Sequence, residues 1–273
     1  MCEFLKEFFA ERKIEYFSVL SFDDMRVTGE EIMARESFTP RSVIIYLLPY
    51  YTGETGNLSR YAASLDYHLA IREVNEGLEA VLKAHFPTCS LRGYGDHSPI
   101  DERYAALIGG LGVAGDNGLL INEKYGSYVF VGDVICDLPP EIFEPMPPTR
   151  ILRCEGCGAC RAACPTGILR GEGCDCLSAI TQRKGALTDD ERRLMREYGT
   201  LWGCDVCQSV CPHNDNPVMT PIEFFYRERI ESLTPELLMR MDKATLRERA
   251  FGWRGKTVLE RNLEVLFSEN AEK

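Results

Sequence analysis

The stretch CEGCGACRAACP, residues 154–165, carries four cysteines in the pattern C-x2-C-x2-C-x3-C-P. A second stretch, CDVCQSVCP at residues 204–212, repeats the pattern with one cysteine fewer. This spacing is typical of bacterial ferredoxins, in which three thiolates of a run bind one [4Fe–4S] cluster and the fourth binds the other cluster. The two stretches together predict a ferredoxin-like domain with two [4Fe–4S] clusters.

The same rule assigns most of the thiols to a cluster. The predicted ligands are Cys154, Cys157, Cys160 and Cys211 for the first cluster, and Cys164, Cys204 and Cys207 for the second. One place at the second cluster stays open, because Cys174 and Cys176 both lie between the two stretches. Structural zinc is the alternative use of C-x2-C pairs, but a zinc site does not need seven thiols with a proline after each run.

Composition limits the class of protein. The chain has 273 residues, 45% of them hydrophobic, which is ordinary for one large globular domain or two smaller ones. It has twelve cysteines, begins with charged residues, and shows neither a leader nor a membrane-length apolar run. These features predict metal binding in the cytoplasm and no membrane association. The net charge of −11 argues against a large nucleic-acid-binding surface.

The distribution of cysteines and prolines predicts the domain organisation. Nine cysteines fall between residues 154 and 211, whereas Cys2, Cys89 and Cys136 are scattered and are interpreted as buried or incidental. The proline-rich stretch at residues 138–150 indicates a boundary. The predicted parts are an α+β domain over 1–150, the double-cluster domain over 151–215 and a helical segment over 216–273 that packs on the core.

Alternating helix and strand patterns favour the α+β class. Apolar residues at helical spacing predict helices, and short β-branched or aromatic runs predict strands of a mixed or antiparallel sheet. The predicted helices cover residues 3–12, 57–85 and 101–111, and the predicted strands cover 42–48, 118–122 and 127–136. The turn EKYG would join the last two strands.

A protein that only carried electrons would not need 150 residues before its clusters, so we expect an acceptor site there. No G-x-G-x-x-G follows a strand and opens a helix, which argues against a nicotinamide-binding Rossmann site. The glycine cluster at residues 109–118 would let the backbone approach a large flat ligand or a phosphate closely. A turn-rich loop before a strand is the alternative interpretation.

Several motifs resemble the epoxyqueuosine reductase family, with gaps, from about residue 40 to the end of the chain. They are SRYAASLDYHLAIRE (59–73), DHSP (96–99), GLGVAGDNGLLINEKYGSYVFVGDVICDL (110–138), FGWRGKTVLERNLEVL (251–266) and both cysteine runs. The resemblance implies a cobalamin-dependent iron–sulfur oxidoreductase that reduces epoxyqueuosine to queuosine in tRNA. Electrons would pass from two [4Fe–4S] clusters to cobalt, and the first domain would bind the corrinoid.

The resemblance also implies roles for particular residues. Asp96 matches the aspartate that acts as general acid, and Cys176 matches the remaining cluster ligand, because CLSAIT is similar to the family's C-I-S-Y-L-T. Cys174 would then be an extra cysteine. The residues implied near base-off cobalamin, at the junction of the two domains, are Tyr67, His68, Gly112, Gly115, Asn117, Gly118 and Leu119.

The glycine loop departs from the family pattern. Residues 112–118 read GVAGDNG where the family commonly has G-W-x-G-K-[HN]-T, so a tryptophan and a lysine are replaced. Two alternatives follow: a corrinoid reductase that acts on a small molecule, as reductive dehalogenases do, or an electron-transfer protein without substrate chemistry. One expected partner is an external low-potential electron donor of the ferredoxin or flavodoxin type. The other is tRNA, although the acidic net charge argues against it.

Overall fold

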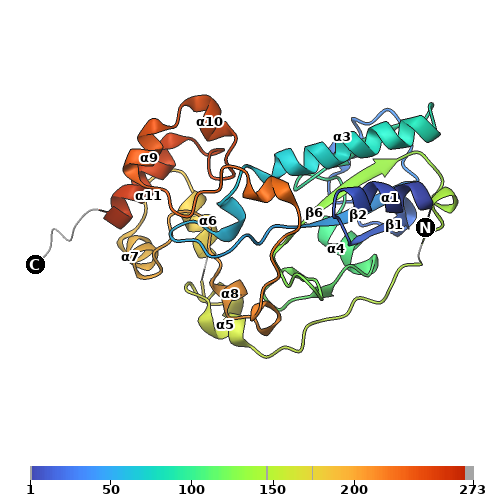
Figure 1. The fold of residues 1–273 in the computed structure, drawn as a ribbon. Coiled ribbons are helices and arrows are strands. Elements are labelled where there is room, and N and C mark those ends of the chain that lie inside the picture. The colour runs from blue at the N-terminus through green and yellow to red at the C-terminus, as the bar shows by residue number, and fades with distance from the viewer. Residues whose placement is uncertain (1, 146, 174, 268–273) are drawn as a thin grey trace, which may run out of the picture. The chain divides into compact units, whose positions relative to one another are not determined.

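The computed structural model describes residues 2–145, 147–173 and 175–267. The chain forms two compact units (Figure 1). The first unit takes in the chain up to Tyr50, residues 68–156 and residues 220–222, and the second takes in residues 51–67, 157–219 and 223 onward. The division into three domains stays a prediction. No helix in the described part of the chain is both long and apolar enough to span a membrane.

The first unit is built on a four-stranded sheet in the order β1-β2-β6-β3. Its strands are β1 (Phe17–Ser21), β2 (Ser42–Pro49), β6 (Val129–Cys136) and β3 (Leu91–Tyr94), and every pair is antiparallel. Every residue of β2 is buried, which fits a strand in the middle of a sheet covered on both faces. The predicted α+β class is confirmed, and the sheet is antiparallel.

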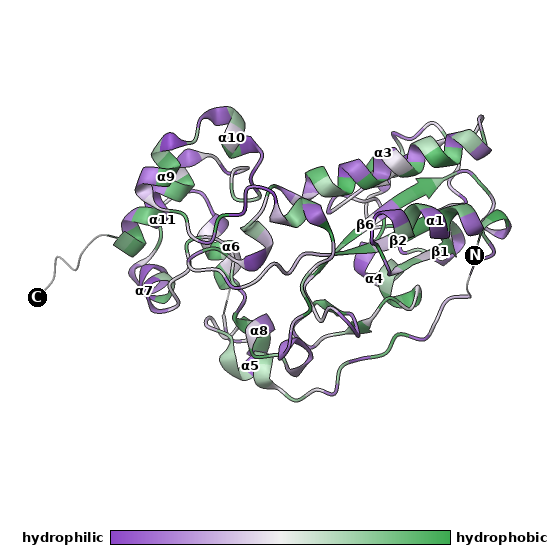
Figure 2. Cartoon of the chain, viewed as in Figure 1, coloured by the Kyte–Doolittle hydropathy of each residue, from purple (hydrophilic) through white to green (hydrophobic). Residues whose placement is uncertain are grey.

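Helices cover both faces of this sheet. On one face lie α1 (Glu3–Glu11) and α3 (Tyr67–His85): the Phe9 ring of α1 is 5.7 Å from that of Tyr46 in β2, and the Tyr46 hydroxyl donates to Oδ1 of Asn75 in α3. On the other face, α4 (Glu102–Ile108) packs its alanines against Ile45 and Ile135. Apolar and polar residues alternate along α3 (Figure 2), as expected for a helix with one buried face.

Two predicted elements differ from the structure. The helix expected from residue 57 begins at Tyr67, because residues 57–59 pair with other segments: Leu58 forms a bridge with Trp202, and Leu233 N–H donates to Oδ1 of Asn57. The strand expected at 118–122 is the short β5 (Leu120–Ile121), which pairs with β4 (Val113–Ala114) rather than extending a hairpin with β6.

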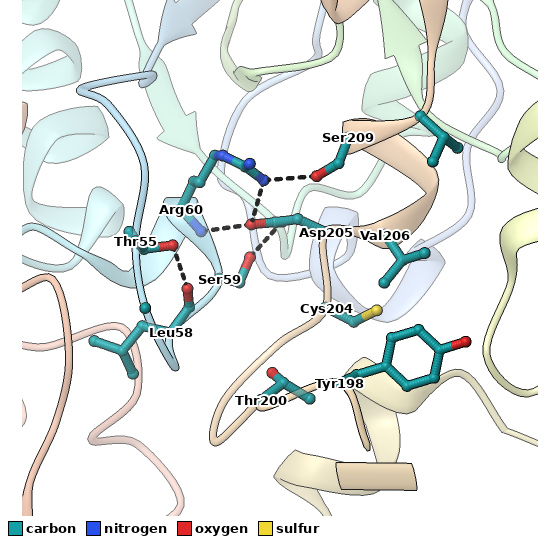
Figure 3. A pocket seen from close by; sticks show the side chains of 12 residues that line it. Thr55, Leu58, Ser59, Arg60, Tyr198, Thr200, Cys204, Asp205, Val206 and Ser209 are labelled. Carbon is teal, nitrogen blue, oxygen red and sulfur yellow. Dashed lines mark hydrogen bonds and ion pairs between the residues drawn. The ribbon is translucent and has the colours of Figure 1, made fainter. Parts of the chain in front are cut away.

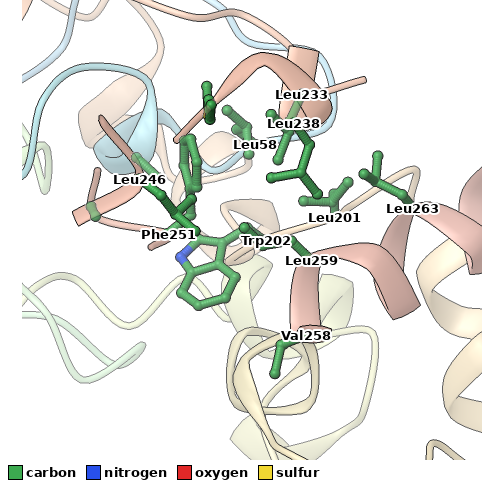
Figure 4. Close-up of a cluster of buried hydrophobic side chains, with 13 residues drawn as sticks. Leu58, Leu201, Trp202, Leu233, Leu238, Leu246, Phe251, Val258, Leu259 and Leu263 are labelled. Atoms are coloured by element: carbon green, nitrogen blue, oxygen red, sulfur yellow. The ribbon is translucent and has the colours of Figure 1, made fainter. Parts of the chain in front are cut away.

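The second unit is helical. Its helices are α5 (Ala159–Ala163), α6 (Leu177–Gln182), α7 (Asp189–Glu197), α8 (Val206–Ser209), α9 (Pro235–Arg240), α10 (Lys243–Arg247) and α11 (Lys256–Phe267); the short α2 (Glu30–Met33) belongs to the first unit. Trp202 is fully buried among leucines from several of these segments, with Leu58 and Leu259 nearby (Figure 4). Its indole N–H donates to the Tyr61 hydroxyl at 2.9 Å, so the polar end of this core residue is satisfied.

Candidate functional site

Asp96 lies in the turn that follows β3. Its backbone adopts the left-handed conformation with φ of 64°, which aspartate tolerates better than most residues. The carboxylate oxygen Oδ2 lies 3.7 Å from Nε2 of His68, at the start of α3. Both side chains reach solvent, with 55% of Asp96 and 42% of His68 exposed. The structure therefore brings together two of the residues that the sequence predicts for the site.

Two carboxyls that the sequence analysis missed support this turn. The Asp96 N–H donates to Oε1 of Glu102 at 3.0 Å, and the Ser98 hydroxyl donates to Oδ2 of Asp133 at 3.1 Å. Asp133 belongs to β6 and Glu102 is the first residue of α4. An acid inside the apolar strand VFVGDVIC was the available signal, because buried acids need a specific partner.

Burial controls the charge of these two carboxyls. It raises the pKa of Glu102, with a further rise from the neighbouring charges of Asp133 and Asp96. It also raises the pKa of Asp133, although hydrogen bonds from Ser98 and Glu102 lower it in part. The two carboxyls hydrogen-bond to each other. The pair therefore holds a proton at pH values at which exposed carboxyls are ionised.

The glycine loop, residues 112–119, forms the turn between β4 and β5. The Gly115 N–H donates to the Leu119 carbonyl at 2.9 Å, and the Leu119 N–H donates to Oδ1 of Asn117 at 3.1 Å. A Cβ at Gly115 would lie 2.5 Å from Oδ1 of Asn117, so only glycine fits. Close packing within the turn thus accounts for Gly115, as the alternative interpretation of the glycine cluster expected.

One polar atom of the glycine loop is unsatisfied. The Nδ2 atom of Asn117 is buried and has no hydrogen-bond partner among the residues that the structure describes. The neighbouring Gly118 carbonyl accepts a hydrogen bond from Arg103. The loop is also joined to a predicted cluster ligand, since the Cys154 N–H donates to the Ala114 carbonyl at 3.0 Å. An unpaired buried amide suits a polar group of a ligand.

Tyr67 belongs to the second unit, unlike His68. Its ring meets that of Tyr61 edge to face with 6.4 Å between centroids, and it packs against the buried cluster around Trp202. These contacts give Tyr67 a structural role within its own unit.

The predicted ligands of the second cluster influence one another. Burial, with smaller contributions from the charges of Cys176, Asp205 and Cys164, raises the pKa of the Cys204 thiol to about 11. Burial likewise raises the pKa of Cys207 to about 12, with contributions from Cys204 and Cys176. Cys176 therefore lies within electrostatic reach of Cys204 and Cys207, and Cys160 lies within reach of Cys207. Cys174 lies outside the described residues.

Asp205 fixes the loop between Cys204 and Cys207. Its carboxylate accepts hydrogen bonds from the Ser59 hydroxyl at 2.6 Å, the Arg60 N–H at 2.7 Å and the Arg60 guanidinium at 3.2 Å (Figure 3). Gly203 permits this approach, because a Cβ there would lie 2.4 Å from Cβ of Ser59. The residues around Asp205 also line a pocket that reaches Cys204.

Three of the four predicted ligands of the first cluster lie in or next to helices α5 and α8, which pack against each other. Cys160 is in α5, Cys157 precedes that helix, and Cys211 follows α8 with its N–H donated to the Gln208 carbonyl at 3.1 Å. Within the described ranges, no three His, Cys, Asp or Glu side chains gather where a single metal ion could bind. The predicted ligands are all thiols in two cysteine runs that each end in proline, which is the ligand type of iron–sulfur clusters.

Cys89 and Cys136 are buried in the first unit, away from the cysteine runs in the sequence. Burial raises the pKa of both thiols, that of Cys136 to about 12. A buried thiol that stays protonated packs as a small apolar side chain.

Comparison with known proteins identifies the family. Residues 153–214 match the family described as 4Fe-4S double cluster binding domain, which confirms that prediction. An epoxyqueuosine reductase of Leadbetterella byssophila is 30% identical over 77% of this chain and 72% of its own length. This chain belongs to the epoxyqueuosine reductase family. The epoxyqueuosine reductase of Listeria monocytogenes is 32% identical over 86% of this chain and 65% of its own length.

A solved structure has the same fold as this epoxyqueuosine reductase family member. It is an epoxyqueuosine reductase with a tRNA-Tyr epoxyqueuosine-modified tRNA stem loop. The TM-score is 0.74 at 23% identity, over 96% of this chain and 80% of that one. The chain spans between 45% and 65% of the length of several curated relatives that it matches.

Proposed function

We propose that this chain is an oxidoreductase that reduces epoxyqueuosine to queuosine in tRNA, with base-off cobalamin and two [4Fe–4S] clusters as cofactors. Family membership supports the reaction, and a relative of the same fold with an epoxyqueuosine-modified stem loop supports tRNA as the substrate. The observation that carries the proposal is the 3.7 Å approach of His68 to Asp96, because the resemblance assigns these residues to the corrinoid and to the acid.

The cofactors supply electrons in the proposed reaction, whereas protein residues supply and position a proton. When bound, the corrinoid and the clusters supply electrons to the substrate carbon, and removal of an epoxide oxygen as water requires two electrons and two protons. Asp96 donates one of these protons from its carboxyl to the departing oxygen, and solvent supplies the other. His68 orients that carboxyl, and the hydrogen bond from the Asp96 N–H to Glu102 fixes the backbone behind it.

The residues present fit the cofactors. The Asn117 amide offers a buried unpaired donor to a polar group of the corrinoid. The other proposed corrinoid residues are Tyr67, His68, Gly112, Gly115, Gly118 and Leu119. The proposed cluster ligands are Cys154, Cys157, Cys160 and Cys211 for one cluster and Cys164, Cys176, Cys204 and Cys207 for the other.

The proposal includes two partners and a location. Besides tRNA, an external low-potential donor of the ferredoxin or flavodoxin type supplies the electrons. The cysteine-rich, metal-binding composition supports a cytoplasmic location. The net charge of −11 predicts that tRNA is bound through a small local surface rather than a broad basic one.

Two steps test this function. First, protein purified without oxygen and with reconstituted clusters is titrated with cobalamin and followed by absorbance; absence of binding would favour an electron-transfer protein. Second, the loaded protein is assayed on epoxyqueuosine-containing tRNA with a chemical reductant. Formation of queuosine supports the proposal, whereas cobalamin binding without queuosine would favour a small-molecule substrate.

A further inference from the structure

Asp133 is an acid in the middle of a buried sheet. It is 0% exposed, and its neighbours across the sheet are Ile45 of β2 and Tyr94 of β3. Its Oδ2 atom accepts the hydrogen bond from Ser98. Its Oδ1 atom is buried and receives no hydrogen bond from a fixed donor in the described part of the chain. A buried carboxyl oxygen without a donor is costly, so a neighbouring group has to supply a proton.

Glu102 is the neighbouring titratable group that shares a proton with Asp133. Its carboxyl hydrogen-bonds to that of Asp133, and two ionised carboxyls cannot share a hydrogen bond. Desolvation together with the charges of Asp133 and Asp96 raises the pKa of Glu102 to about 9. The pair therefore keeps a shared proton near pH 7, as carboxyls in a desolvated setting can.

The other groups around the pair do not replace this donor. The Tyr46 hydroxyl on β2 donates to Asn75, and the Tyr94 hydroxyl on β3 donates to Glu36. Burial raises the pKa of both phenols, so they stay neutral. His68 faces Asp96, on the solvent side of the turn.

We propose that Glu102 is a positioning residue for Asp96, holding it in the left-handed conformation while Glu102 itself is fixed by Asp133. The turn is anchored at two points, through the Asp96 N–H to Glu102 and the Ser98 hydroxyl to Asp133. A non-glycine residue with φ of 64° needs such support. The inference deepens the proposed function and rests on it for the role of Asp96.

The neutral state of Glu102 has a second effect on Asp96. After Asp96 donates its proton it carries a negative charge, and an ionised Glu102 behind it would oppose that charge. A neutral Glu102 removes this repulsion while its Oε1 atom still accepts the Asp96 N–H. Proton donation by Asp96 should therefore weaken at alkaline pH, as Glu102 ionises.

Three variants test whether Glu102 positions Asp96. Glu102→Gln keeps a carbonyl oxygen for the Asp96 N–H and an amide donor for Asp133, and it cannot ionise. Glu102→Leu removes both interactions at similar volume. Glu30→Gln is the matched control, because Glu30 is an exposed glutamate at the same position of another helix, the first residue of α2.

Two measurements on the protein without corrinoid test the geometry. Infrared spectra of the wild type at neutral pH should show the carbonyl band of a protonated carboxyl, which Glu102→Gln removes and Glu30→Gln retains. Hydrogen exchange of the Asp96 amide, measured by NMR, should stay slow in Glu102→Gln and become about tenfold faster in Glu102→Leu. Absence of the band in the wild type, or equal exchange in all variants, would overturn the inference.

Turnover on epoxyqueuosine-containing tRNA gives the third readout. Glu102→Gln should retain activity within about threefold of the wild type at pH 7 and lose the alkaline decline, whereas Glu102→Leu should fall by at least about tenfold. A Glu102→Gln variant as inactive as Asp96→Asn would overturn the positioning role. If the wild type itself makes no queuosine, the proposed function fails, and the infrared and exchange data still decide the inference.

Discussion

The Nε2 atom of His68 lies 3.7 Å from Oδ2 of Asp96, and both side chains reach solvent. An exposed pair of this kind adds little to stability, because water screens the charges. Its geometry is instead set by the elements that carry the two residues. His68 is placed by the start of α3, and Asp96 by a turn tied to α4 and β6 through Glu102 and Asp133.

Asp96→Asn should therefore separate chemistry from folding. Asparagine tolerates the left-handed backbone as well as aspartate does, so the free energy of unfolding should change by less than about 0.5 kcal/mol. Turnover on epoxyqueuosine-containing tRNA should fall by at least about 100-fold, because the proton donor is lost. Chemical denaturation and the tRNA assay measure the two effects. Asp24→Asn, an exposed aspartate in the same unit, is the control, and retained turnover in Asp96→Asn would refute the acid assignment.

Asn117→Asp tests the role of the glycine loop in cofactor binding. The substitution keeps Oδ1, which accepts the Leu119 N–H, and removes the unpaired Nδ2 donor. The turn should keep its shape while the Kd for cobalamin, measured by absorbance titration, rises by about tenfold. An unchanged Kd would show that Nδ2 does not face the corrinoid.

Much of the fold could be predicted from the sequence because its signals are local. The strand at β2 is a continuous apolar run, and α1 carries a clear helical face. The helix over 57–85 was predicted ten residues too long at its start, since the backbone around Leu58 pairs with Trp202, a contact that no local pattern encodes. Distant pairing overrides helix-compatible sequence in such segments.

Only those residues of the candidate site that belong to a sequence motif could be predicted. Asp96 and the cysteines belong to recognisable runs, whereas Glu102 and Asp133 matter only because α4 packs over β6. A glutamate at the start of a helix is normally expected to be solvated and to interact favourably with the helix dipole. The sequence therefore gives no sign that Glu102 is partly buried beneath the DHSP turn. The glycines of the loop are visible in the sequence, whereas the close packing of Gly115 against Asn117 depends on how the turn folds.

Stability should depend on pH through the buried carboxyls. Burial raises the pKa of Glu102 from its ordinary value of 4.5 to about 9, so the folded state binds more protons than the unfolded state between these values. The free energy of unfolding should then fall as pH rises, by at most about 1.4 kcal/mol per pH unit for one group. Denaturant titrations from pH 5 to about 9 measure the slope. Glu102→Gln should reduce the slope while Asp133 keeps its own contribution, and Glu30→Gln should leave the slope unchanged; parallel curves for all three proteins would contradict the shifted pKa of Glu102.

Removing Asp205 should loosen the Cys204–Cys207 loop. Asp205 and Arg60 are 9% and 12% exposed. Arg60 keeps its ion pair with Glu54, so the cost of losing Asp205 comes from the donors of Ser59 and Arg60 left unsatisfied, about 1–3 kcal/mol. Asp205→Ala should lower the unfolding free energy by about that amount and make iron easier to remove with a chelator. Glu172→Ala breaks an exposed pair with Arg170 and should change either quantity little. Equal iron loss in the two variants would mean that Asp205 does not support the loop.

The fourth ligand of the second cluster can be assigned by paired serine substitutions. Cys176 lies within electrostatic reach of Cys204 and Cys207, and the resemblance assigns it to their cluster. Cys176→Ser should therefore lose about half of the bound iron, because one of two clusters loses a thiolate. Cys174→Ser and Cys89→Ser should retain all of it. Iron analysis of anaerobically reconstituted protein, with electron paramagnetic resonance of the reduced clusters, measures the outcome. The reverse result, iron loss in Cys174→Ser alone, would assign the ligand to Cys174 and reject the match of CLSAIT to the family motif.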